Sequence, residues 1–113
     1  MYTYYIEVVR VLDGDTIDAM IDLGFNVWVK RRIRLMGIDA PEVRTRDDEE
    51  KARGFICKER VEELLRAYDN KAELISHGVG KYGRVLGLVK TKGSASYIND
   101  ILVSEGLAKA YEY

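Results

Sequence analysis

The sequence predicts a mainly β protein, in which five short strands close into a small barrel and about two α-helices pack against it. Three observations predict this class. Apolar and polar residues alternate in the first third of the chain, apolar residues at helical spacing follow, and a glycine-rich turn separates two further alternating stretches. The order is three strands, a helix, two strands and a helix. A five-stranded Greek-key barrel of this kind is the OB-fold, whose exposed face often binds oligonucleotides.

Each predicted strand places one set of side chains on one face. The strands cover residues 1–11, 15–23, 27–38, 71–77 and 84–91. The second strand should place Ile17, Ala19, Ile21 and Leu23 on one face, and the third should place Val27, Val29, Ile33 and Leu35 on one side. The other face of the third strand then carries Trp28, Lys30, Arg32 and Arg34. Trp28, on the same strand face as Arg34, is either a base-stacking residue or an ordinary aromatic on the barrel surface.

Two helices complete the predicted domain, which spans residues 1–113. The longer helix begins with Asp47 or Asp48 as its N-cap and runs to about Tyr68. Its predicted apolar face comprises Ala52, Phe55, Ile56, Val61, Leu64, Leu65 and Tyr68. The second helix covers residues 97–106 and is closed by Gly106.

Composition excludes several classes of protein. The single cysteine, Cys57, forms no internal disulfide and should pack as a small apolar residue. With one cysteine and one histidine, His77, the sequence lacks the usual ligands of a zinc site, and we expect none. No apolar run is long enough to cross a membrane, and we expect no membrane partner. The N-terminus is typical of a strand and not of a signal peptide, so we expect a cytoplasmic protein or the mature form of a secreted one.

The charge is small overall but unevenly placed. The net charge is −1, whereas residues 26–34 hold four basic and no acidic residues, and residues 47–63 hold seven acidic and four basic ones. A basic strand face beside an acidic helix allows an anionic partner at one site. Two solvated faces explain the same pattern.

Three short motifs carry charged residues beside turns. They are VLDGDTI at 11–17, RIRLMGIDAPE at 32–42 and KYGRVLG at 81–87. Taken singly, each is explained by an ordinary turn or strand end. However, Pro41 restricts Ala40 to an extended backbone and leaves the Ala40 carbonyl free beside the carboxylates of Asp39 and Glu42. Carboxylates with a backbone carbonyl suit a hard cation such as Ca²⁺.

Together the motifs DGDT, RLMGIDAPE, KYGR and SEGLAKAYEY resemble the staphylococcal-nuclease-like (thermonuclease) family in their order and spacing. The resemblance runs from about Val8 to Tyr113. It implies an OB-fold enzyme that uses Ca²⁺ to hydrolyse the phosphodiester bonds of DNA and RNA with little sequence specificity, leaving 3′-phosphate products. The sequence stops at Tyr113, before the family's last helix, so we expect either a member with two helices or a minimal version of the domain.

The resemblance implies a role for each motif residue. Asp15 and Asp39 correspond to the carboxylate ligands of Ca²⁺, and the backbone carbonyl of Ala40 corresponds to a third ligand, with Asp13 beside them. Ala40 stands where the family usually has threonine, a mild departure because only the carbonyl is needed. The catalytic residues implied are Arg34 and Arg84, which hold the scissile phosphate, and Glu42, the general base for the attacking water.

Four further residues match positions around the bound nucleotide. Lys81 and Tyr82 match residues that contact a terminal phosphate, and Tyr111 and Tyr113 match tyrosines beside the nucleotide pocket. Asn99 matches a structural position whose side chain bonds to the backbone.

A non-catalytic alternative exists: an OB-fold module that binds single-stranded nucleic acid or a protein partner. Nuclease-like repeats of this kind lack several of the charged residues named above. This sequence retains Asp15, Arg34, Asp39, Glu42 and Arg84. We therefore expect the enzyme.

Overall fold

The computed structural model describes residues 2–112 of the chain. The elements follow in the order β1 (Tyr2–Asp13), β2 (Thr16–Asp22), β3 (Trp28–Leu35), β4 (Ile38–Asp39), α1 (Asp48–Arg66), β5 (Lys71–Val79), the 3₁₀ turn η1 (Lys81–Gly83), β6 (Val85–Thr91), α2 (Ile98–Ser104) and β7 (Lys109–Ala110). Neither helix in this range is long and apolar enough to cross a membrane.

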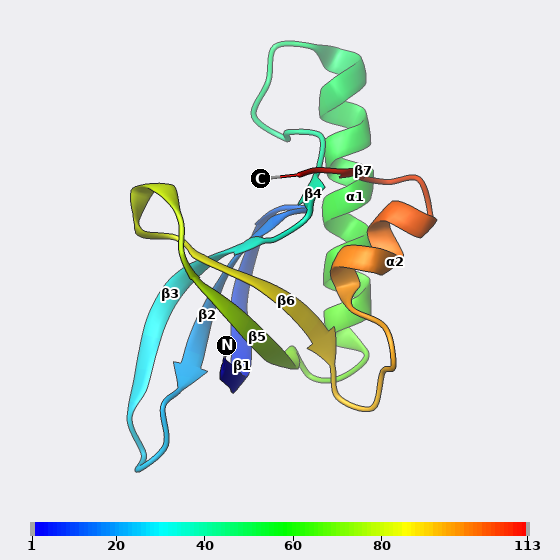
Figure 1. Cartoon of the computed structure of the whole chain (residues 1–113). Coiled ribbons are helices and arrows are strands. Elements are labelled where there is room, and N and C mark those ends of the chain that lie inside the picture. Colours follow the sequence, from blue (N-terminus) through cyan, green and yellow to red (C-terminus); the bar gives the residue numbers. More distant parts are fainter. Residues whose placement is uncertain (1, 113) are drawn as a thin grey trace.

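The barrel closes in the strand order β1-β2-β3-β6-β5, with β5 returning to pair with β1. Strands β3 and β6 pair in parallel, and the other neighbours pair antiparallel. Figure 1 shows α1 running alongside the barrel, with β4 and β7 at the end away from the β2–β3 hairpin. The predicted OB-fold class, a five-stranded barrel with two helices, is confirmed.

Alternation along the strands places the core as predicted, except at strand ends. Ile17, Ala19 and Ile21 of β2 are buried, as are Ile33 and Leu35 of β3. The predicted strand bounds are wrong at Leu23 and Val27, because both residues lie in the β2–β3 connection beyond the paired residues, where they are about half exposed.

The predicted third strand is two strands. It breaks at the Met36–Gly37 turn, where Gly37 adopts a left-handed φ of +82° that a side chain would disfavour. The chain resumes as β4, which leaves the barrel and pairs with β7 through Ile38↔Ala110 and Asp39↔Lys109. This small second sheet, absent from the sequence-based prediction, carries Asp39 away from the barrel wall.

Helix α1 begins as predicted, with Asp47 as its N-cap accepting from the backbone N–H groups of Glu49 and Glu50. Its buried face is only partly the predicted one. Val61 and Leu65 are buried, but the first half of the helix buries Gly54 and Cys57. Four other residues of the predicted apolar face are exposed: Ala52, Phe55, Ile56 and Tyr68.

Asn99 joins helix α2 to two separate parts of the barrel. The side chain is 1% exposed, its Oδ1 accepts from the Val89 N–H at 3.1 Å, and its Nδ2 donates to the carbonyls of Met36 at 2.7 Å and Gly87 at 3.3 Å. These bonds tie α2 to β6 and to the turn that precedes β4. The expected structural role of Asn99 matches this geometry.

We predict that Asn99→Ala destabilises the fold by about 2 kcal/mol or more, because it leaves the buried Val89 N–H and Met36 carbonyl without partners. Urea unfolding followed by circular dichroism measures this loss. Its neighbour Asp100 is exposed, so Asp100→Ala serves as the matched control and should change stability far less. Equal losses in the two variants would show that the Asn99 bonds contribute little.

Candidate functional site: an acidic and arginine cluster at the barrel end

Asp15 lies in the tight turn between β1 and β2 and connects it to two later segments. Its side chain is 10% exposed. Oδ2 accepts from the Ala40 N–H at 2.8 Å, Oδ1 accepts from the Thr16 hydroxyl at 2.9 Å, and the Asp15 backbone carbonyl accepts from the Leu35 N–H at 2.8 Å. The turn, the end of β3 and the exit of β4 are therefore held together.

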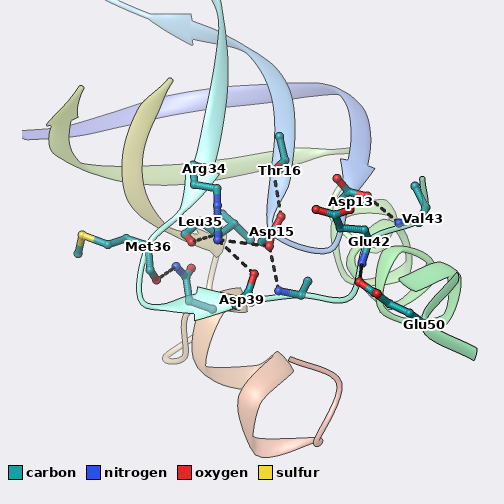
Figure 2. A network of polar contacts seen from close by, with 12 residues as sticks. Asp13, Asp15, Thr16, Arg34, Leu35, Met36, Asp39, Glu42, Val43 and Glu50 are labelled. Carbon is teal, nitrogen blue, oxygen red and sulfur yellow. Dashed lines mark hydrogen bonds and ion pairs between the residues drawn. The ribbon is translucent and has the colours of Figure 1, made fainter. Parts of the chain in front are cut away.

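Arg34 brings the two predicted metal-binding carboxylates to one place. Strand β3 pairs Arg34 with Thr16, which aims the guanidinium at this turn, and Nη1 donates to the Leu35 carbonyl at 2.8 Å. Nη2 lies 3.4 Å from Asp15 Oδ2 and 3.7 Å from Asp39 Oδ1. Figure 2 marks both contacts with dashed lines. Asp15 and Asp39 thus face a common point, one buried and the other 60% exposed.

The turn that follows Asp39 rests on α1 where the helix has a glycine. A Cβ at Gly54 would lie 2.6 Å from the Glu42 carbonyl oxygen and 3.0 Å from that of Pro41. The Glu42 N–H donates to Oε2 of Glu50 at 3.2 Å. The turn is therefore pressed against the helix, and the Glu42 residue remains exposed at the end of the barrel.

Asp13 bonds to the other end of the turn that carries Glu42. Its Oδ1 accepts from the Val43 N–H at 3.1 Å, so Asp13 lies next to the Glu42 segment (Figure 2). The next residue, Gly14, leaves room for the buried Cys57 thiol, which a Cβ at position 14 would overlap. Burial, with smaller contributions from Asp15 and Asp13, raises the pKa of Cys57 to about 11. The thiol is thus neutral near pH 7 and packs as an apolar group, as predicted.

The residues of the cluster fit a hard cation. Within residues 2–112, no three side chains of histidine, cysteine, aspartate or glutamate gather as a metal-binding group. A cation beside Asp15 and Asp39 would therefore complete its shell with backbone carbonyl oxygens, such as that of Ala40, and with water. Two carboxylates and neutral oxygens, with no nitrogen or sulfur donor, suit Ca²⁺ or Mg²⁺.

Arg84 reaches this end of the barrel from the η1 turn. Its Nε donates to the Lys81 carbonyl at 3.4 Å, and its guanidinium carbon lies 5.8 Å from the Tyr82 ring centroid. It lines a groove of about 1000 Å³ together with Asp13 and Thr16, next to Asp15. Among the described residues no ion pair joins Arg84 to Asp15 or Asp39, so the structure places Arg84 beside the cluster and not within it.

The four predicted nucleotide contacts lie on two separate segments. Lys81 and Tyr82 are exposed in η1, where Tyr82 has a left-handed φ of +62° and projects into solvent. Tyr111 follows β7, and its N–H donates to the Gly37 carbonyl at 2.9 Å. Tyr113 lies outside the described residues.

Two features of the site were missed by sequence reasoning. The first is Gly54. Glycine is disfavoured inside a helix, so its presence there indicates that another segment approaches the helix closely. The second is an ion pair between Arg32 and Asp18 on the outer face of β2 and β3. Arg32 Nε donates to Asp18 Oδ1 at 2.9 Å, and Arg32 Nη2 donates to Asp18 Oδ2 at 3.2 Å. Alternation places both residues on outward faces, but only the register of the strands sets them opposite each other.

The comparisons with known proteins identify the family. Residues 32–113 match the family model described as staphylococcal nuclease homologue. The chain is 35% identical over 114 residues to the micrococcal nuclease of Shigella flexneri, covering 95% of this chain and 58% of the relative. It is 32% identical over 116 residues to the protein ParB of Escherichia coli, covering 95% of this chain and 57% of the relative.

A third relative, an uncharacterized protein of Methanocaldococcus jannaschii, is 29% identical over 132 residues, covering 96% of this chain and 59% of that protein. The chain thus spans less than two thirds of the length of each of these relatives. With an OB-type barrel, an acidic and arginine cluster at its end and a family model matching most of its length, the chain belongs to the staphylococcal nuclease homologue family.

We predict that Gly54→Ala lowers stability by about 1–3 kcal/mol, although alanine normally favours a helix interior over glycine by about 1 kcal/mol. The added Cβ collides with the backbone of Pro41 and Glu42 and displaces that turn. Thermal unfolding by circular dichroism tests the sign of the change. A raised melting temperature would show that the turn does not rest on the helix.

Proposed function

We propose that this chain is a Ca²⁺-dependent nuclease that hydrolyses phosphodiester bonds in DNA and RNA with little sequence specificity, leaving 3′-phosphate products. Membership of a nuclease family supports the reaction class. The observation that carries the proposal is that the carboxylates of Asp15 and Asp39 both lie close to one guanidinium nitrogen of Arg34, at 3.4 and 3.7 Å. This arrangement offers oxygen ligands for a cation directly beside a phosphate-binding arginine.

The carboxylates of Asp15 and Asp39, with the Ala40 carbonyl, would hold the Ca²⁺ ion. When bound, the ion supplies positive charge beside the phosphate and stabilises the negative charge that develops on its oxygens. The hydrogen bonds from Ala40 and Thr16 orient Asp15 for this role before any ligand arrives. Ala40 needs no hydroxyl, because position 40 contributes through its backbone.

The two arginines would bind the scissile phosphate through their planar, permanently charged guanidinium groups. Arg34 is already oriented by its bond to the Leu35 carbonyl, whereas Arg84 approaches from the η1 turn. Hydrogen bonds that strengthen as charge develops on the phosphoryl oxygens lower the barrier to water attack.

Glu42 would accept the proton of the attacking water. The residue is exposed beside Asp13, in a turn fixed by Glu50 and by Gly54 of α1. A carboxylate held in this way acts as a general base or orients the water. Lys81, Tyr82, Tyr111 and Tyr113 would contact the nucleotide on either side of the reacting phosphate.

We predict cleavage of single-stranded DNA and RNA in Ca²⁺ and none after chelation. Mg²⁺ should support little turnover, because it requires a smaller and more regular octahedral shell than two carboxylates and a backbone carbonyl readily provide. Gel assays on single-stranded DNA, supercoiled DNA and total RNA in each ion measure this. Full activity in chelator would contradict the proposed metal, and inactivity in Ca²⁺ of a folded protein would favour a non-catalytic binding module.

We predict that Arg34→Lys and Arg84→Lys each lose about 10²–10³-fold in rate, because lysine keeps the charge but cannot bind phosphate through two parallel hydrogen bonds. The matched control is Arg66→Lys at the exposed end of α1, which should retain full activity. Initial rates at saturating Ca²⁺ provide the comparison. Near wild-type rates in both site variants would show that these arginines do not hold the phosphate.

A further inference from the structure

A basic groove leads away from the cluster along the outer face of the barrel. The groove has a volume of about 1000 Å³ and adjoins the site through Asp13, Thr16 and Arg84. Eight of the 18 lysines and arginines in the sequence line it, with two aspartates, although the net charge of the chain is −1. The chain therefore concentrates positive charge on one surface, where it attracts an anion.

The floor of the groove is formed by neighbouring strands. The register places Arg10 beside Asp18 and Asp18 beside Arg32 across β1, β2 and β3. The bidentate bond from Arg32, assisted by the charges of Lys30 and Arg10, lowers the pKa of Asp18. Asp18 thus stays ionised and is largely neutralised by Arg32. Among the described residues no carboxylate forms an ion pair with Arg10 or Lys30.

The floor also continues from the site along β3. Arg34, Arg32 and Lys30 alternate along one face of β3, so Lys30 lies about 13 Å along the strand from Arg34. A nucleic-acid chain bound at Arg34 and Arg84 can continue along this face.

The opposite wall is one stripe of helix α1. Lys51, Phe55 and Lys58 are spaced four and three residues apart, which puts them on one side of the helix, and all three line the groove. Phe55 is 42% exposed, and the Lys58 Nζ lies 5.8 Å from its ring centroid. An exposed aromatic ring between two lysines offers a base a stacking surface with cations at both sides for phosphates.

We infer that this groove binds a single-stranded segment of the nucleic-acid substrate beyond the cleaved bond, with Phe55 stacking on a base and Lys30, Lys51 and Lys58 contacting phosphates. This inference rests on the proposed nuclease function. The groove selects single strands because the bases of a duplex are stacked on each other and present no free face to Phe55. Among the described residues no glutamate lines the groove: Glu59, Glu62 and Glu63 of α1 line a different hollow, and Glu50 lines a third.

The test measures binding without cleavage. A fluorescein-labelled oligothymidylate of about 12 nucleotides, within the range that OB-folds cover, is titrated in chelator and followed by fluorescence anisotropy at several salt concentrations. Phe55→Ala should bind about 5- to 150-fold more weakly with an unchanged salt dependence. The double variant Lys51→Gln/Lys58→Gln should reduce the slope of log K against log salt by about 1.4, or about 0.7 for each lost contact.

Matched controls lie outside the groove. Phe25 is fully exposed in the β2–β3 hairpin, so Phe25→Ala should bind as the wild type does. Lys71→Gln/Lys92→Gln removes two charges from a separate hollow beside Tyr5 and Trp28 and should leave the slope nearly unchanged. Equal losses in control and groove variants would overturn the inference. So would binding of a matching duplex as tight as that of the single strand.

A second readout separates this inference from the proposed function. Hydrolysis of a nitrophenyl phosphodiester of a single nucleoside, measured in Ca²⁺, needs only the reacting end of the site, so the groove variants should cleave it at the wild-type rate. A wild-type protein that binds the oligonucleotide through the groove but hydrolyses no substrate would contradict the nuclease proposal alone. Loss of single-nucleoside hydrolysis in the groove variants would show that these residues act at the cluster, contrary to the inference.

Discussion

The buried carboxylate of Asp15 is the group on which the functional end of the barrel depends. It accepts hydrogen bonds from the Thr16 hydroxyl and from the Ala40 N–H and lies 3.4 Å from the Arg34 guanidinium. A buried carboxylate is costly unless such partners surround it. These bonds hold three segments together: the β1–β2 turn, the end of β3 and the exit of β4.

The chain around Asp15 is built to keep Asp39 and Glu42 in place. The Met36–Gly37 turn, fixed by Asn99, directs the chain out of the barrel into β4, and β7 pairs with that strand. The close contact with Gly54 then stops the turn carrying Glu42 from moving toward the helix. A site oriented before the substrate arrives spends less free energy on ordering during the reaction. The same helix forms one wall of the basic groove, which links the site to the surface that we infer binds the substrate.

Much of the fold could be predicted from the sequence, because alternation in β2 and β3 and the Asp47 cap have local causes. Phe55 could not be placed in this way. Its spacing fits an apolar helix face, but the part of α1 that carries it faces a groove, where the side chain is 42% exposed. Periodicity defines a face of a helix and does not tell which part of that face a neighbour covers. Trp28 shows the same limit: it shares a strand face with Arg34, but it lies six positions away, about 20 Å along the strand.

The candidate site, like the fold, could be predicted only in part. The Asp15, Arg34 and Asp39 motif residues come together, and the Glu42 turn lies beside them, because each lies at or near a strand end where the barrel order brings the chain together. The path of Arg84 along the η1 turn depends on a left-handed residue, Tyr82, that no local pattern indicates. The metal, the substrate and the residue roles, including those of Tyr111 and Tyr113, stay predictions.

Calcium binding to the isolated protein tests the central claim most directly. Asp39 suits this test because its side chain is 60% exposed and forms an ion pair with Arg34 at a long distance of 3.7 Å. Asp39→Asn should therefore leave the fold intact. In isothermal titration calorimetry without nucleic acid, we expect the wild type to bind one Ca²⁺ per chain, and Asp39→Asn to bind it about tenfold or more weakly at an unchanged melting temperature. A folded wild-type protein that takes up no Ca²⁺, or equal affinities in the two proteins, would contradict the claim that Asp15 and Asp39 form a cation site.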